Sequence, residues 1–226
     1  MFSSAISAHA RRVWKGGDVK PDWTVPATLL ADPEWVRARI GGATKLYGCA
    51  RPEVLGTIWW YSLSSVLVAP ALEGLVAGTL VDPALAAIEL DLVADGRFLG
   101  ARSTRPLTGG LAELGTAFAG TLGTAITTIA AVTGARERAL GAIATDSIGN
   151  RLLWTPDPER AMPLAEPLVA AIGLDLPKPR FVRVGRTPAV RRASCCLIYE
   201  VGNPKCVSCP RQTPSEREAR LRAALG

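Results

Sequence analysis

The chain has 226 residues, 48% of them hydrophobic, with a mean hydropathy of +0.20 and a formal net charge of +6. This length is sufficient for one substantial hydrophobic core, or for one core with a small appendage. His9 is the only histidine, which excludes a Ser-His-Asp triad, a Cys-His nucleophile, a zinc-binding histidine pair and a Rieske centre. The sequence also lacks a phosphate-binding loop and a dinucleotide fingerprint, so no nicotinamide or flavin site is recognisable in it.

The N-terminal third is predicted to be helical after an irregular start. Asp32-Pro33-Glu34 is a helix start signal with Gly41-Gly42 as its stop, and Pro52-Glu53 opens a second helix. The aromatic run Trp59-Trp60-Tyr61 cannot lie on one face of that helix. One or two of its side chains therefore line the core, and another is free to border a pocket. Cys49 stands alone and is interpreted as a small buried hydrophobe.

A β-hairpin is predicted between residues 87 and 102. Apolar and acidic residues alternate from Ile88 to Leu92, Asp95-Gly96 is typical of a two-residue turn, and apolar residues return at Phe98-Leu99. The fold class that follows is mainly α-helical, an α+β arrangement with this one small hairpin and a C-terminal cysteine-rich segment.

Most of the chain after the hairpin is predicted to be helical. The Ala-, Gly- and Thr-rich run 110–133 predicts a closely packed central helix, and further helices are expected at 135–154 and 157–172. Residues 181–184 look extended. A capping box at residues 213–216 predicts a short surface helix at the end of the chain.

Two uncharged runs, Val54–Leu72 and Leu114–Ala135, are long enough to span a membrane. Their proline, serine, glycine and threonine content lowers their hydropathy, so both are predicted to be buried core helices. No signal sequence is recognisable in Met1 to Ala10, and we expect a cytoplasmic protein.

Pro177-Lys178-Pro179 is the predicted domain boundary. It separates a helical scaffold on the substrate side, residues 1–177, from a basic C-terminal segment, residues 178–226. The segment holds eleven basic and three acidic residues, a net charge of +8, whereas the first 177 residues carry −2. A basic tail of this kind suits an anionic partner.

Four of the five cysteines lie within fifteen residues: Cys195, Cys196, Cys206 and Cys209. A Cys-x-x-Cys pair directs two sulfurs at one point, and the Asn203-Pro204 turn can fold the adjacent pair back toward it. Adjacent cysteines on an extended strand point to opposite faces, so Cys195 and Cys196 can both be ligands only where the backbone bends between them. The set is compatible with a [2Fe–2S] cluster, one structural zinc ion or two disulfides. A cluster is the most tolerant of an adjacent pair, because its ligands are spread over two irons.

This pattern resembles the C-terminal region of the FhuF-type ferric-siderophore reductases. The likeness lies in the adjacent cysteines preceded by Ser194 and followed by Tyr199, and in a Cys-x-x-Cys motif followed by Pro210. Nine residues separate the two pairs, one fewer than in the family pattern. The specific part of the resemblance covers Arg191 to Arg211.

The resemblance implies an oxidoreductase whose [2Fe–2S] cluster is held by Cys195, Cys196, Cys206 and Cys209. It implies one-electron reduction of the Fe(III) of a siderophore, of the hydroxamate type, so that Fe(II) is released. A protein electron donor such as a ferredoxin and peripheral contact with the inner membrane face would accompany this activity, and no nucleic acid partner is expected.

Two other hypotheses stay open at this point. In the first, a zinc-stapled Cys₄ module orders a basic tail that binds nucleic acid or a protein. In the second, the same cluster serves an electron carrier or redox sensor. A cluster held by four thiolates is negatively charged, so nearby cations favour its reduced state. By position in the sequence, the candidate cations are Arg186, Arg191, Arg192, Lys205 and Arg211.

Overall fold

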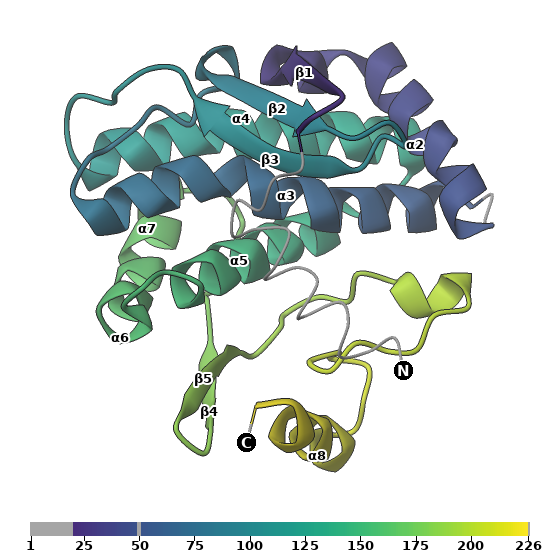
Figure 1. Cartoon of the computed structure of the whole chain (residues 1–226), viewed down its shortest axis with the longest axis vertical. Coiled ribbons are helices and arrows are strands. Elements are labelled where there is room, and N and C mark those ends of the chain that lie inside the picture. The colour runs from purple at the N-terminus through teal and green to yellow at the C-terminus, as the bar shows by residue number, and fades with distance from the viewer. Residues whose placement is uncertain (1–19, 49–50, 226) are drawn as a thin grey trace.

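The computed structural model describes residues 20–48 and 51–225. His9 and Cys49 lie outside these residues, so the expectations for them stay predictions. The elements, drawn in Figure 1, are β1 (Trp23–Pro26), η1 (Ala27–Ala31), α2 (Pro33–Tyr47), α3 (Pro52–Ala77), η2 (Leu85–Ala87), β2 (Ile88–Leu92), β3 (Phe98–Ser103), α4 (Leu111–Thr133), α5 (Glu137–Leu153), α6 (Pro158–Ala161), η3 (Met162–Leu164), α7 (Ala165–Ile172), β4 (Phe181–Val184), β5 (Thr187–Val190), η4 (Ile198–Val201) and α8 (Pro214–Leu225).

Helix α2 is longer than predicted. It begins where expected, with the Asp32 carboxylate accepting two backbone N–H groups of the first turn. It then continues through Gly41-Gly42 and ends at Gly48, whose φ of 60° breaks the helix. The expected stop at the glycine pair is therefore wrong. A helical glycine costs about 1 kcal/mol, and burial of the flanking Ile40 and Ala43 offsets that cost.

The predicted hairpin is present, and β1 adds a strand that was not predicted. The sheet is antiparallel with the order β1-β2-β3. The three apolar residues of β2 are at most 2% exposed and join the core. On the opposite face, Arg102 of β3 pairs with both Glu89 (2.7 Å) and Asp91 (2.9 Å). Three residues rather than two lie between Val93 and Arg97, whose backbone groups close the turn at 3.0 Å.

Helix α3 is the centre of the core. It packs between the sheet and α5, with α4 alongside (Figure 1). Its Trp60 is fully buried and donates its indole N–H to the Leu140 carbonyl of α5 at 2.8 Å. By length and composition α3 and α4 are both apolar enough to cross a membrane, but 78% of the apolar window of α3 is buried within the fold, against 39% for α4.

Helix α4 forms as predicted, and Gly115 allows α7 to pack closely against it. A Cβ atom at this position would lie 2.4 Å from the carbonyl carbon and oxygen of Ala171. We therefore expect Gly115→Ala to lower the free energy of unfolding by about 1–3 kcal/mol, through overpacking. Gly120 of the same helix is exposed and has open space around it, so Gly120→Ala should raise stability by roughly 0.5–1 kcal/mol. Urea unfolding followed by circular dichroism measures both, and equal effects would contradict this packing.

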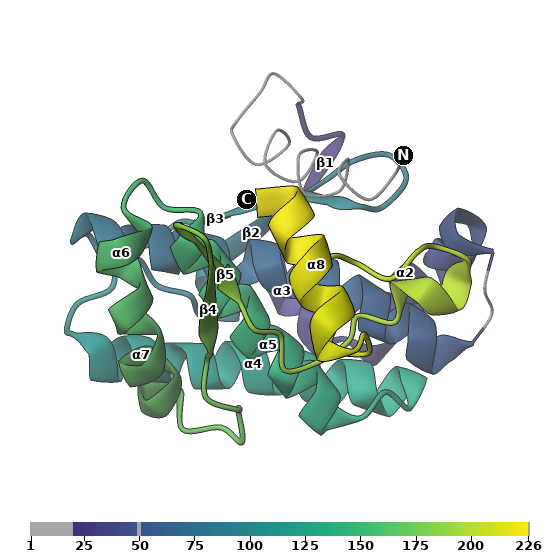
Figure 2. The same cartoon turned by 90° about the horizontal axis from the view of Figure 1, so that it is seen from below.

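The segment after α7 forms a second, smaller apolar cluster. The β4–β5 hairpin, of which only the first strand was expected, contributes Val184 and Ala189, and α8 contributes Leu221. Helix α8 starts with the predicted capping box, in which Thr213 and Glu216 each accept the other's backbone N–H (3.3 and 3.0 Å). Seen from below, this segment crosses the α3–α5 layer (Figure 2). The boundary at residue 177 stays a prediction.

Candidate metal centre

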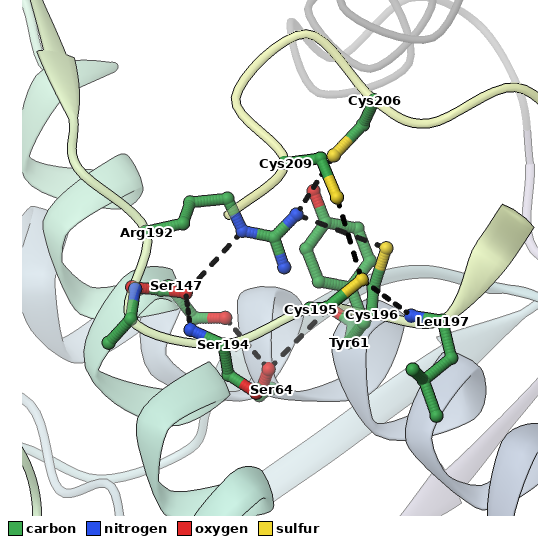
Figure 3. Close-up of polar contacts among 12 residues, drawn as sticks. Tyr61, Ser64, Ser147, Arg192, Ser194, Cys195, Cys196, Leu197, Cys206 and Cys209 are labelled. Atoms are coloured by element: carbon green, nitrogen blue, oxygen red, sulfur yellow. Dashed lines mark hydrogen bonds and ion pairs between the residues drawn. The ribbon is translucent and has the colours of Figure 1, made fainter. Parts of the chain in front are cut away.

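The loop between β5 and α8 brings the four predicted cysteines together (Figure 3). The Sγ atoms of Cys195 and Cys209 lie 3.6 Å apart. Nη1 of Arg192 lies 3.2 Å from Sγ of Cys206 and 3.9 Å from Sγ of Cys196. All four thiols are free, and only Cys206 is more than marginally exposed. We call the four sulfurs, taken in the order in which neighbouring side chains interact (209, 195, 196, 206), the sulfur row.

The backbone bends immediately after the adjacent pair. Leu197 has a φ of 62°, a left-handed conformation that costs a non-glycine residue about 1–2 kcal/mol. Its N–H donates to Sγ of Cys195 at 3.4 Å. Helix η4 and Gly202, with a φ of 82°, then reverse the chain before Asn203-Pro204 is reached. This bend follows the adjacent pair instead of falling between Cys195 and Cys196, and it lies earlier in the loop than the Asn203-Pro204 turn suggested by the sequence.

Asp146 of α5 anchors the start of the loop. Its carboxylate, 2% exposed, accepts the backbone N–H groups of Ala193 (2.8 Å) and Ser194 (3.3 Å) and pairs with Nε of Arg192 (3.4 Å). Burial raises the pKa of Asp146, and the Arg192 charge and these N–H groups oppose that rise. Because this carboxylate binds three consecutive residues, 192–194, it fixes the position of the backbone that leads into Cys195.

Arg192 is the cation of the site. Its side chain is 2% exposed, and its guanidinium lies over the ring of Tyr61 of α3, 4.8 Å from the centroid. Burial alone would lower its pKa, but Tyr61, the nearby thiolates and Asp146 together raise the pKa well above the ordinary value. Burial also raises the pKa of Tyr61 to about 12, so the phenol stays neutral. Arg192 therefore holds a permanent positive charge against the sulfur row.

The thiols do not share their protons equally. Hydrogen bonds from Cys195 and Cys206, helped by the Arg192 charge, lower the pKa of Cys196 to about 2. The same hydrogen bonds raise the pKa of Cys195 and Cys206 above the ordinary value. Thiolate is the form that binds metal, so the centre of the row is already in its ligating state.

The chemistry of these groups fits a two-iron cofactor. Four cysteine sulfurs are the usual ligands of a [2Fe–2S] cluster. Within residues 20–48 and 51–225, no three His, Cys, Asp or Glu side chains are grouped so as to hold a single metal ion. Nη2 of Arg192 is buried without an acceptor in the described part of the chain. An inorganic sulfide beside the cysteines would supply one, since a buried N–H seeks a partner.

Of the five cations suggested by sequence, only Arg192 contacts a sulfur in the described structure. Lys205 and Arg211 lie over the Tyr199 ring instead, 6.0 and 5.7 Å from its centroid. Glu200, next to that ring, pairs with Arg51 of the scaffold at 2.7 Å. These charges cover the outer side of the loop, where the Cys-x-x-Cys turn is partly exposed.

A Cys₄ loop docked on a mainly helical scaffold, with a buried arginine on its sulfurs, places the protein among those that bind metal through four cysteines. Residues 192–211 match the family model of the FhuF 2Fe-2S C-terminal domain. The match begins at Arg192 and includes all four cysteines, and it identifies the cofactor as a [2Fe–2S] cluster. It makes a zinc staple the weaker alternative. No curated protein and no solved structure matches the chain.

Two residues of the site were not identified from sequence as functional. Asp146 could have been suspected as the one acidic residue in the apolar run 139–149. Tyr61 belongs to the aromatic run of α3, whose side chains point to different sides of the helix, as the helical period requires. Trp60 lies in the core, and Tyr61 faces Arg192. Their contact with residue 192, far away in the sequence, is a tertiary feature with no local signal.

Proposed function

We propose that the protein is a ferric-siderophore reductase. In this function the reduced protein gives one electron to chelated Fe(III), which becomes Fe(II), and no bond forms between the protein and the chelate. The observation that carries the proposal is the overlap of the FhuF 2Fe-2S match with the cysteine loop around Arg192. The substrate would be of the hydroxamate type.

A bound [2Fe–2S] cluster supplies reversible one-electron chemistry. The four cysteines would hold it, and Asp146 keeps the first of them in position through the backbone of Ala193 and Ser194. The fixed charge of Arg192 favours the reduced state because it compensates added negative charge. The partly exposed Cys206 leaves one side of the site near the surface, as electron transfer to an outside acceptor requires.

The electron would come from a protein donor such as a ferredoxin. The net charge of +8 on residues 178–226 supports an acidic donor, because complementary charge speeds encounter.

We propose that the protein works in the cytoplasm, with peripheral contact at the inner membrane face where imported chelates arrive.

The test uses anaerobically purified, chemically reduced protein mixed with a ferric trihydroxamate and a ferrous-specific chromogenic chelator. We expect one Fe(II) trapped per reduced cluster, and repeated turnover when a reduced ferredoxin is supplied. Cys206→Ser should abolish the reaction, whereas Arg37→Gln, on exposed helix α2, should leave it unchanged. A protein that exchanges electrons with ferredoxin but yields no Fe(II) is an electron carrier, which would contradict the proposal.

A further inference from the structure

A groove with a volume of about 420 Å³ lies next to the cysteine loop. It is bordered by the start of α5, by the chain around Asp175 and Pro177, and by Ala193 and Ser194 of the loop. Its volume falls within the roughly 300–1,000 Å³ of typical small-molecule sites. Ser194 directly precedes Cys195, and consecutive Cα atoms lie about 3.8 Å apart. Figure 3 shows the two residues next to each other in the loop, so the groove borders the segment that carries the cysteines.

Both walls of the groove are tied to α5. On one side, the Ala193 N–H donates to the buried Asp146 carboxylate at 2.8 Å. On the other, the Thr145 hydroxyl donates to the Pro177 carbonyl at 3.1 Å. Asp146 and Thr145 are both at most 2% exposed, so these anchors are part of the core. The groove is therefore preformed, which reduces the ordering cost of binding.

The charge of the groove is positive. Arg136 and Arg138 line it and are exposed, and neither forms an ion pair with a carboxylate in the described part of the chain. Asp175 is the only acidic residue among those that line it. Ala139 and Ala142 form an apolar surface between these groups. Unpaired arginines are suited to carboxylates, which they bind in bidentate geometry.

We propose that this groove binds the ferric chelate, and that the preferred chelate is anionic: a hydroxamate siderophore that also carries carboxylates. The arginines would hold the carboxylates, the alanines would contact the aliphatic backbone of the ligand, and the iron would lie near the Ser194 end of the cysteine loop. The inference rests on the proposed function and adds the place of binding and the charge of the substrate. A neutral ferric trihydroxamate has no carboxylate to pair with either arginine, so it should bind more weakly.

The test separates binding from reduction by using gallium. Ga(III) takes the place of Fe(III) in these chelates but accepts no electron under these conditions. The Ga(III) complexes of a citrate-based dihydroxamate and of a neutral trihydroxamate are titrated into the cluster-loaded protein by calorimetry. We expect the anionic complex to bind at least roughly tenfold more tightly, and Arg136→Gln/Arg138→Gln to remove that preference. The control variant Arg37→Gln/Arg39→Gln removes two arginines of α2 that do not line the groove, and it should bind as the unmodified protein does.

The outcomes distinguish the groove from the reductase activity. Equal affinity of the double variant and the unmodified protein for the anionic gallium complex would overturn the groove, even if ferric chelates are still reduced. Equal affinity of the unmodified protein for both complexes would overturn the charge preference. If the double variant no longer binds the anionic complex while the visible spectrum of the cluster is unchanged, the groove is supported, whether or not Fe(II) is formed. A protein that binds the chelate but forms no Fe(II) would contradict the proposed function and not the groove.

Discussion

Cys196→Ser is expected to abolish cluster binding. Cys196 lies in the middle of the sulfur row, in contact with Cys195 and Cys206, and is 3% exposed. Its lowered pKa makes it the sulfur already present as thiolate. A serine hydroxyl stays protonated at neutral pH and is a poorer ligand for iron. We expect iron and acid-labile sulfide per chain to fall at least roughly tenfold, because even loss of an outer-shell partner costs 10–100-fold in metal affinity.

The matched control is Cys49→Ser, which alters the one cysteine outside the C-terminal segment. It should keep the full iron and sulfide content and the visible absorption of the unmodified protein. Circular dichroism in the far ultraviolet checks that the Cys196 variant still folds, since its scaffold core does not include the loop. A folded Cys196→Ser protein with unchanged iron and sulfide would show that the row of sulfurs is not the ligand set.

Arg192→Gln is expected to make the reduction potential of the cluster more negative. The guanidinium contacts two of the four sulfurs and is screened from solvent, so its charge acts at low dielectric. At an effective dielectric constant of 20, a unit charge a few ångströms away contributes about 2–4 kcal/mol. For a one-electron couple this corresponds to a shift of roughly 90–170 mV, since a tenfold change, about 1.4 kcal/mol, is 59 mV. A redox titration followed by electron paramagnetic resonance measures it.

Two further variants separate charge from packing at this position. Arg192→Lys keeps the charge and should shift the potential much less than Arg192→Gln. Arg191→Gln removes the neighbouring exposed arginine and should leave the potential nearly unchanged, because water screens that charge. An unaltered reduction potential in Arg192→Gln would show that the charge of Arg192 does not stabilise the reduced cluster.

Arg192→Gln also affects stability, because it leaves Asp146 buried without its cation. Breaking a buried ion pair in this way destabilises a protein by about 3–5 kcal/mol.

Local signals predicted much of the scaffold. The hairpin followed from the alternation in 88–92, and α4 and α8 followed from helical spacing and from the capping box at Thr213. The exceptions share one cause. Gly41-Gly42 predicts the end of a helix, yet α2 continues to Tyr47 because the residues on either side of the glycines are buried in the core. Strand β1 has only four residues and lies beside Pro21 and ends at Pro26, so the sequence did not predict it, and it forms by pairing with the edge of β2.

The sequence by itself determined the set of candidate ligands: four cysteines in a spacing that resembles the FhuF pattern, almost no histidine and a basic segment around them. Only the tertiary structure decided which charge reaches the sulfurs, because Arg192 is one of several nearby cations by sequence and becomes unique by burial between Tyr61 and Asp146. The groove at Arg136 and Ser194 likewise joins segments far apart in the chain. Ligand identity is a property of residue type, and it can be read locally. Position and dielectric environment depend on packing between distant elements, which no local pattern encodes.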